Sequence, residues 1–326
     1  MKTRKHTILR GFTLIELMTA MAITAILVAV IMQMTTKGID IWRGIREDVS
    51  TTSRARMALS CLGHDFEAMQ MRLADNRYEW LVARPSKEFK GVGREMLVPR
   101  SAQCIFFTST VDRNPVVSSD STARRSYRDA RAHSPETQGD VNCVGYRLIY
   151  RDQVLNQPAT SKGQPGIFPR FSLYRQLVDT KETFQRLLGT TNLKTAYDAF
   201  VKDDEKNILC EDIIEFNVAL TIDHSLGKGD PERGYAKYET KVVPVISSNG
   251  KEKEIDVYGD RIEVDGQVLY NPRIRAINIS LTVLTEEGAA IAEQVRLGRR
   301  RAPKAADFFR RYTRTFSTMV RPPQPL

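Results

Sequence analysis

The sequence predicts an α+β protein in which one long N-terminal helix precedes a body of antiparallel strands. Apolar residues fill most positions from Phe12 to Met34, and they then recur every three, four or seven residues as far as Leu73, which traces one face of an α-helix. After Pro85 the period changes to short runs of β-branched and aromatic residues that partly alternate with polar ones. A helix followed by such strands favours an α+β class over a parallel α/β fold.

Four segments follow from these patterns. We expect a basic leader over residues 1–11, a membrane-spanning half of the helix over 12–36, an amphipathic half over 37–84, and a β-rich body over 85–326. The net charge is +10, and the leader holds four of the positive side chains, which leaves +6 for the rest. That balance is mildly basic and predicts no nucleic-acid partner by itself.

The apolar segment Phe12–Met34 predicts a single membrane span. It is long enough for the roughly 20 residues that cross a hydrocarbon core, and its only charged side chain is Glu16. The cations that precede it place the N-terminus in the cytoplasm and the body outside the inner membrane, in the periplasm: Lys2, Arg4, Lys5 and Arg10. A secretory signal would be shorter and end in small residues. A plain signal anchor remains the alternative, but a carboxylate is costly in a bilayer, so chance explains Glu16 poorly.

Residues Arg10–Leu17 read Arg-Gly-Phe-Thr-Leu-Ile-Glu-Leu. This string resembles the N-terminal signal of type IV pilins and type II secretion pseudopilins. The resemblance implies that a prepilin peptidase cuts between Gly11 and Phe12 and N-methylates Phe12. It also implies that the Glu16 carboxylate meets the N-terminal amine of a neighbouring subunit, so that other pilins or pseudopilins are partners through this helix. Because Gly11 lacks a side chain, the peptidase can approach the backbone closely.

The second half of the helix should cover the body with an apolar stripe from Ile41 to Leu73. Gly38 and Gly44 predict a weak point or bend, and the helix should fray after Leu73, before Pro85. Further helices are expected at Lys181–Asp203 and Ala289–Leu297, an exposed loop at Asp112–Asp140, and a hairpin turn at Asp265-Gly266. The expected strands are Ile105–Thr110, Val144–Arg151, Phe171–Val178, Ile213–Ile222, Arg261–Leu269, Arg273–Leu284 and, as a last edge strand, Phe308–Val320.

The body also resembles the minor pseudopilin J and the larger minor pilins. The similar segments are His64–Glu67, Tyr146–Leu148, Leu173–Arg175, Leu209–Val218 and Ile277–Leu284. The chain departs from that branch by its length, since Asp112–Asp140 and Leu226–Val257 look like insertions. In length and loops it is also similar to the large pilin-like cassette protein C of the Verrucomicrobia type.

No catalytic or metal-binding pattern stands out, so we expect no enzyme, cofactor or metal. The histidines lack metal spacing, and Ser248–Lys251 fits S-x-x-K but reads as an Asn-Gly turn. The acidic run from Asp198 to Glu205 fits a solvated helix end better than a calcium loop. Arg299–Arg301 with Lys304 fits either a solvated helix end or a contact with an acidic neighbour.

Cysteine usage leaves the redox state open. If the body is exported, disulfides are allowed, and four cysteines permit three complete pairings. Cys61 fits a small buried residue in a helix, whereas both states stay open for Cys104, Cys143 and Cys210.

These observations predict a minor pilin or pseudopilin that is processed by prepilin peptidase and assembled into a type II secretion pseudopilus-like structure. One alternative is a minor subunit of a type IV pilus that serves adhesion or DNA uptake. A different class is a membrane-tethered enzyme or ligand-binding domain that uses the same anchor. The absence of convergent His, Cys or Ser motifs argues against that class.

Overall fold

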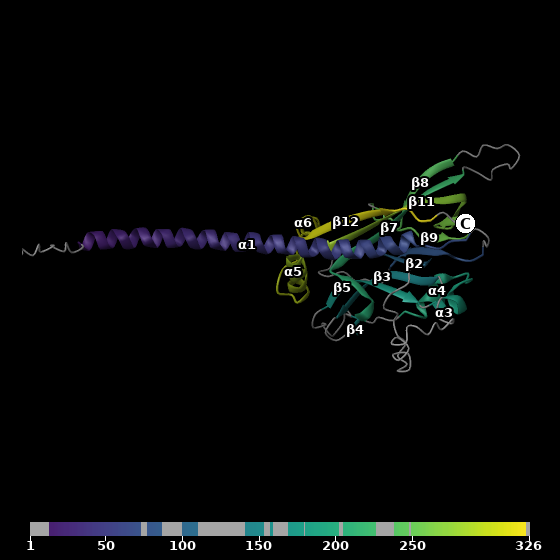
Figure 1. The fold of residues 1–326 in the computed structure, drawn as a ribbon, viewed down its shortest axis with the longest axis horizontal. Helices are drawn as coiled ribbons and strands as arrows, with labels where there is room; N and C mark the ends of the chain where they lie inside the picture. Colours follow the sequence, from purple (N-terminus) through teal and green to yellow (C-terminus); the bar gives the residue numbers. More distant parts are fainter. Residues whose placement is uncertain are drawn as a thin grey trace, which may run out of the picture. The chain divides into compact units, whose positions relative to one another are not determined.

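The computed structural model describes residues 13–72, 77–86, 100–109, 141–152, 157–158, 169–178, 180–201, 205–225, 238–247 and 249–323. The chain divides into two compact units, residues 1–50 and residues 51–326. Figure 1 gives the labels of the helices and strands. The expected loop Asp112–Asp140 and the helix residue Leu73 lie outside the described residues.

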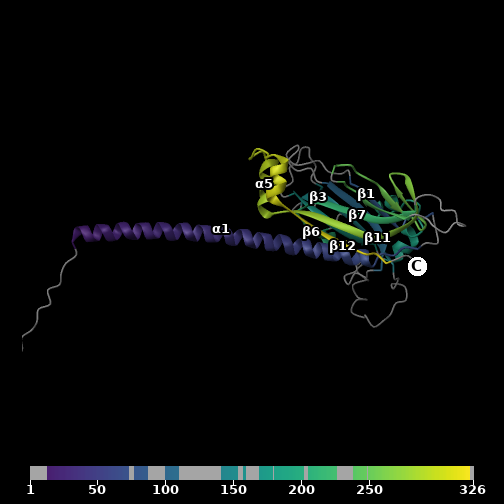
Figure 2. The same ribbon diagram turned by 90° about the horizontal axis from the view of Figure 1, so that it is seen from above.

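The elements confirm a long N-terminal helix followed by a strand-rich body, a mixed α+β fold (Figures 1 and 2). In chain order they are α1 (Leu14–Glu67), β1 (Leu81–Pro85), β2 (Arg100–Thr108), β3 (Asn142–Asp152), β4 (Gln157–Pro158), β5 (Pro169–Val178), α3 (Thr180–Glu182), the π-helical turn η1 (Thr183–Leu187), α4 (Leu193–Asp198), η2 (Glu205–Asn207), β6 (Ile208–Glu211), β7 (Ile213–Ser225), β8 (Tyr238–Pro244), β9 (Ile255–Val257), β10 (Arg261–Val264), β11 (Gln267–Leu284), α5 (Glu286–Arg296), α6 (Ala305–Tyr312) and β12 (Thr313–Val320).

Helix α1 is continuous through Gly38 and Gly44 but ends at Glu67, earlier than the expected fraying after Leu73. The backbone that follows pairs with the body instead of extending the helix. Gln70 N donates to Phe107 O at 2.8 Å, and Met69 forms a bridge with Thr108. Because the Gln70 N–H bonds to β2, it is not available for a further helical hydrogen bond, and the helix ends.

The buried face of α1 is also shorter than the sequence predicts. Ile41, Ile45 and Val49 belong to the expected stripe, yet they are 63 %, 59 % and 63 % exposed. The first buried residue of α1 is Thr51, which is also the first residue of the second compact unit. Spacing alone marks a helical face, and it does not say where along the helix that face acquires a partner.

Six strands of the body close into a ring that resembles a barrel. Each pairs with the next in the order β2-β1-β9-β10-β11-β7, and β7 returns to β2 through Arg100↔Glu215 and Ser101↔Phe216. That closing pair is parallel, whereas the other pairings among the described residues are antiparallel as predicted. Strands β3, β5 and β6 extend the sheet beyond β2, while β8 and β12 add to β7 and β11.

The main core lies between the sheet and the α1 residues of the second unit. Ala55, Ala58, Leu62 and Phe66 are fully buried and belong to one apolar cluster with side chains of the sheet. The Phe66 ring stacks on Phe106 with centroids 4.2 Å apart. A smaller cluster on the other face of the sheet surrounds Trp80, Phe107 and Tyr197.

The hairpin turn at Asp265-Gly266 is confirmed, since both residues have positive φ (51° and 76°) between β10 and β11. The continuous helix at Lys181–Asp203 is wrong for its described part, which breaks into α3, η1 and α4. The break passes through Gly189 at φ 86°, and α4 restarts where the Asn192 side chain accepts from Thr195 N at 2.9 Å.

Two further sequence-based boundaries are wrong. The segment Phe308–Val320 is a strand only from Thr313, because residues 305–312 form α6 and bury Phe308 on one helical face. The segment Leu226–Val257 looked like an insertion and no strand was predicted in it, yet it supplies β8 and β9. Strand β9 has only three residues, too few to show a period.

A chain truncated to begin near Asp48 should fold as a soluble body, and one that begins at Trp80 should aggregate. The shorter chain lacks Leu62 and Phe66, and each such buried side chain is worth about 1.5–3 kcal/mol relative to exposure. Size-exclusion chromatography and thermal unfolding of both chains test this. A Trp80 chain that is monomeric and equally heat-stable would show that α1 is no part of the core.

Candidate functional site

Glu16 lies in the first turn of α1, and the described residues begin three positions before it, at Thr13. The other two residues of the predicted processing site, Gly11 and Phe12, lie outside the described residues. Of the predicted site, the structure therefore places only the Glu16 carboxylate.

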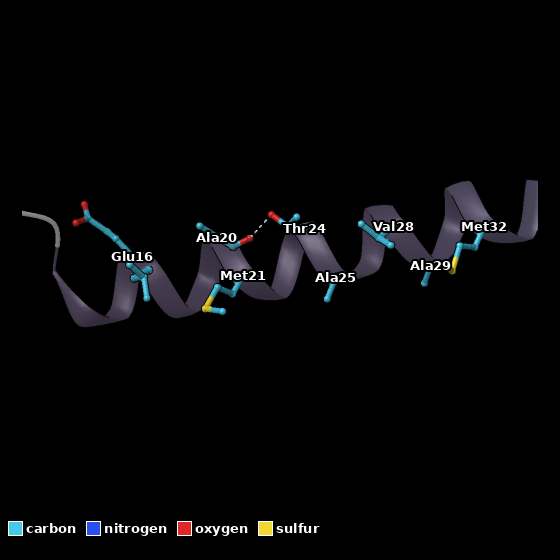
Figure 3. Close-up of a pocket in the computed structure, with 9 residues that line it drawn as sticks. Glu16, Ala20, Met21, Thr24, Ala25, Val28, Ala29 and Met32 are labelled. Atoms are coloured by element: carbon cyan, nitrogen blue, oxygen red, sulfur yellow. Dashed lines mark hydrogen bonds between the residues drawn. The ribbon is translucent and has the colours of Figure 1, made fainter.

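Thr13 and Glu16 form a reciprocal cap at the start of α1. Glu16 Oε2 accepts from Thr13 N at 2.9 Å and from Thr13 Oγ1 at 2.8 Å, while Glu16 N donates to Thr13 Oγ1 at 3.4 Å. This is a capping box, and it satisfies backbone donors that the first turn leaves open. The bonds turn the carboxylate back toward the start of the helix (Figure 3). The Thr-x-x-Glu spacing that signals this box is visible in the sequence, although no cap was predicted there.

The first part of α1 offers small side chains on successive turns. Ala20, Thr24, Ala25 and Ala29 line a shallow hollow along the helix, flanked by Met21 and Met32 (Figure 3). Thr24 Oγ1 donates to Ala20 O at 2.7 Å, so this hydroxyl is satisfied within the helix. The window of α1 that is long and apolar enough to cross a membrane buries none of its surface in the structure. Small residues at such spacing let a second apolar helix approach closely in a membrane.

In the body, three of the segments that carry the resemblance to pseudopilin J meet at one buried carboxylate. Asp65 of α1 is 1 % exposed. Its Oδ2 accepts from Tyr146 Oη of β3 and from Arg175 Nε of β5 at 2.7 Å, and its Oδ1 accepts from Arg175 Nη2 at 3.1 Å. We call Asp65, Tyr146 and Arg175 the buried triad. It joins α1 to two neighbouring strands.

Within the buried triad, Arg175 stays charged and the Tyr146 phenol stays neutral. Burial, reinforced by the Asp65 charge, raises the pKa of Tyr146, so the phenol stays a hydrogen-bond donor. Burial alone would lower the pKa of Arg175, but the hydrogen bonds and charge of Asp65 raise it. The pair is bidentate and well aligned, which is the geometry a buried ion pair requires.

A groove of about 440 Å³ lies on the body beside α5. Asp212 stands at its inner side with φ 60° and accepts from Arg170 Nη1 at 2.9 Å and from Arg54 Nη1 at 3.5 Å. Burial raises the pKa of Asp212, and the two arginines oppose that rise. Apolar side chains of α5, β3 and β5 line much of the rest of the groove.

The other polar groups singled out in the sequence do not gather. His64 is exposed and His224 is buried, while His133 lies outside the described residues. Asn249-Gly250 is a turn with Gly250 at φ 79°, as predicted. Asp198 pairs with Lys194 at 2.7 Å, and Asp203 and Asp204 are not described. No group of three His, Cys, Asp or Glu side chains with a metal-binding arrangement occurs in the described part of the chain.

The four cysteines are thiols in the structure. Cys104 and Cys143 lie on the adjacent strands β2 and β3, and burial raises the pKa of both. Burial also raises the pKa of Cys210, to about 11. These three thiols therefore stay protonated and unreactive at neutral pH.

Comparison with known proteins assigns the N-terminal segment. Residues 10–32 match the model of the prokaryotic N-terminal methylation motif. The match supports a type IV pilin-like, structural subunit that prepilin peptidase recognises and that assembles with other pilins. With the exposed apolar helix, it also fits a membrane-anchored single-pass protein. No curated protein and no solved structure matches the chain.

Asp65→Ala should lower the free energy of unfolding of the body by about 3–5 kcal/mol, because Arg175 then loses its buried carboxylate. Glu67→Ala, an exposed acid on the same helix, is the matched control and should stay within about 0.5 kcal/mol. Asp65→Leu combined with Tyr146→Phe and Arg175→Met should recover most of the loss, because no polar group of the buried triad is then left without a partner. Urea unfolding measures all of these. Equal effects of Asp65→Ala and Glu67→Ala would show that the buried triad is not a stabilising contact.

Proposed function

We propose that the chain is a minor pilin or pseudopilin subunit with a pilin-type body, made as a precursor, cut after Gly11 and methylated on Phe12. Its N-terminal helix then builds it into a type II secretion pseudopilus-like assembly. The observation that carries the proposal is the methylation motif over residues 10–32, which overlaps the apolar segment Phe12–Met34, whose only charge is Glu16.

The geometry at the start of α1 supports this function. The helix begins at Leu14, two residues after the proposed cut, so the peptide bond that the peptidase must reach precedes the helical hydrogen-bond ladder. Thr13 holds Glu16 through Oε2, whereas Oε1 has no partner among the residues that the structure describes. A neighbour's Phe12 amine can bind Oε1 without breaking the capping box, and the pair would offset part of its own desolvation.

The outer surface of the helix supports assembly rather than a passive anchor. Lipid tails are as apolar as the helix, so tight packing and not hydrophobicity must hold helices together in a membrane. The small residues between Ala20 and Ala29 permit that packing. Beyond them Ile41, Trp42 and Ile45 remain exposed, which gives neighbouring subunits a further apolar surface.

The tethered ligand-binding domain remains the competing class, and the groove beside α5 is where such a ligand would sit. Its lining is nearly balanced between arginines and carboxylates, and this gives no preference for one ligand charge. In a ligand-binding domain the Glu16 carboxylate would serve only as a helix cap through Oε2, whereas the assembly proposal also gives a partner to Oε1.

Gly11→Val should leave an uncut precursor in the membrane, because a branched side chain blocks close approach to the scissile bond. Gly44→Val is the matched control, since a side chain there meets nothing within 4 Å, and it should be cut normally. A gel shift and N-terminal sequencing after co-expression with prepilin peptidase measure the cut. Normal processing of Gly11→Val would refute the assigned cleavage site.

Glu16→Ala and Glu16→Gln should both insert and be cut normally, yet both should cross-link to partner pilins about tenfold less, since charge-assisted bonds are the strong ones. The Gln side chain can still accept from Thr13, so the Glu16→Gln variant keeps the helix cap and removes only the charge. A defect in Ala alone would assign Glu16 to capping. Unchanged cross-linking in both variants would contradict the assembly role and favour the tethered domain.

A further inference from the structure

Helices α5 and α6 and the turn between them form a hairpin with an unusually basic outer surface. Residues 297–314 carry seven cations and one acid, Asp307. All seven cations are exposed: Arg299, Arg300, Arg301, Lys304, Arg310, Arg311 and Arg314. Such a density of one sign repels itself and attracts surfaces of the opposite charge.

The hairpin is fixed to the body by its apolar side. Phe308 is fully buried and Ile291 is 4 % exposed. Thr285 N donates to Tyr312 O at 2.9 Å, and a side chain at Gly288 would come within 2.8 Å of Tyr312 Cβ, so the two helices are in close contact at one end. The buried side leaves the charged side facing outward as a rigid surface.

These cations differ from the other arginines of the same region. Arg296 pairs with Glu293, and Arg54 pairs with Asp212. In contrast, Arg299, Arg300, Arg301, Lys304, Arg310 and Arg311 have no ion pair with any residue that the structure describes. These six charges are therefore available to bind a partner outside the body.

The hairpin lies at the end of the body where α1 enters. Arg54, one turn after the first residue of this unit, approaches Glu286 of α5 with Nη2 to Oε1 at 3.8 Å. Both views place α5 at one end of the strands (Figures 1 and 2). The apolar span ends at Met34, and residues 35–50 link it to this unit and tether the unit to the bilayer.

We propose that the α5–α6 hairpin binds the anionic headgroups of the membrane in which the chain is anchored. Each Lys or Arg near an anionic bilayer is attracted to it, and the attraction falls off within a Debye length of roughly 8 Å. Leu297, 41 % exposed at the tip of the hairpin, adds an apolar contact beside the arginines. The proposal rests on α1 as a membrane anchor, and it is independent of cleavage and of pilin assembly.

Two observations favour a lipid surface over an acidic protein partner. The anchor holds a bilayer at high effective concentration without any second protein. The cations also come from the turn and from the last turn of α6, so they spread along the hairpin and do not converge on one pocket. A diffuse field of charge suits a diffuse anionic surface.

The test uses the full chain in nanodiscs of phosphatidylcholine alone or of an equal mixture with phosphatidylglycerol. A photo-crosslinking residue replaces Leu297, and in a control chain it replaces Val242, which is 61 % exposed on β8. Mass spectrometry counts lipid adducts. We expect adducts at position 297 in the mixed nanodiscs, at least about tenfold fewer without phosphatidylglycerol or at high salt, and few at position 242.

Charge-removal variants complete the test. The variant with Arg299, Arg300, Arg301 and Lys304 all changed to Gln should lose the adducts. The matched control changes four exposed cations elsewhere, Lys206, Lys251, Arg273 and Arg275, to Gln and should keep them. Equal adducts in both lipids, or adducts that survive loss of the four hairpin charges, would overturn the proposal. Cross-links that form only to an added pilin would assign the hairpin to a protein partner and also overturn it.

Discussion

One helix has to satisfy two environments, and the rest of the structure follows from this constraint. From Leu17 to Met34, α1 carries no charged residue and is largely apolar on every side, as a bilayer requires. From Thr51 to Glu67 it buries a single face against the sheet and leaves its other faces polar. An α-helix serves both environments without a break because all its backbone hydrogen bonds are internal. A charged side chain in the membrane-spanning part is costly, so Glu16 points to a function. A charged side chain buried in the body needs a partner of opposite charge, and Asp65 has one in Arg175.

Asp65 shows how the body is organised around the helix. Its carboxylate binds Arg175 and Tyr146 from two strands, while Phe66, the next residue, stacks on a third. Two successive positions on one helix thus tie β2, β3 and β5 together. The six-stranded ring then closes through the parallel β2–β7 contact, so only the outer strands keep free edges. The α5–α6 hairpin is fixed to this body by the buried side chains of Phe308 and Ile291, and it presents its cations outward.

Periodicity was sufficient to predict the helix, most of the longer strands and the Asp-Gly turn, because each of these is set by local chemistry. It misplaced the end of α1, since Met69 and Gln70 pair with β2, a contact that depends on residues far along the chain. Closure of the six-stranded ring could not be predicted for the same reason. The segments of the buried triad were recognised by resemblance, but nothing local says that Asp65 meets Arg175. The Thr13–Glu16 cap was predictable from spacing and was missed.

The proposed processing is tested most directly by the intact mass of the chain recovered from membranes of cells with and without prepilin peptidase. We expect the peptidase to remove residues 1–11 and to add one methyl group, which fragmentation should place on the amine of Phe12. An identical mass in both cells, or a new N-terminus anywhere other than Phe12, would contradict it.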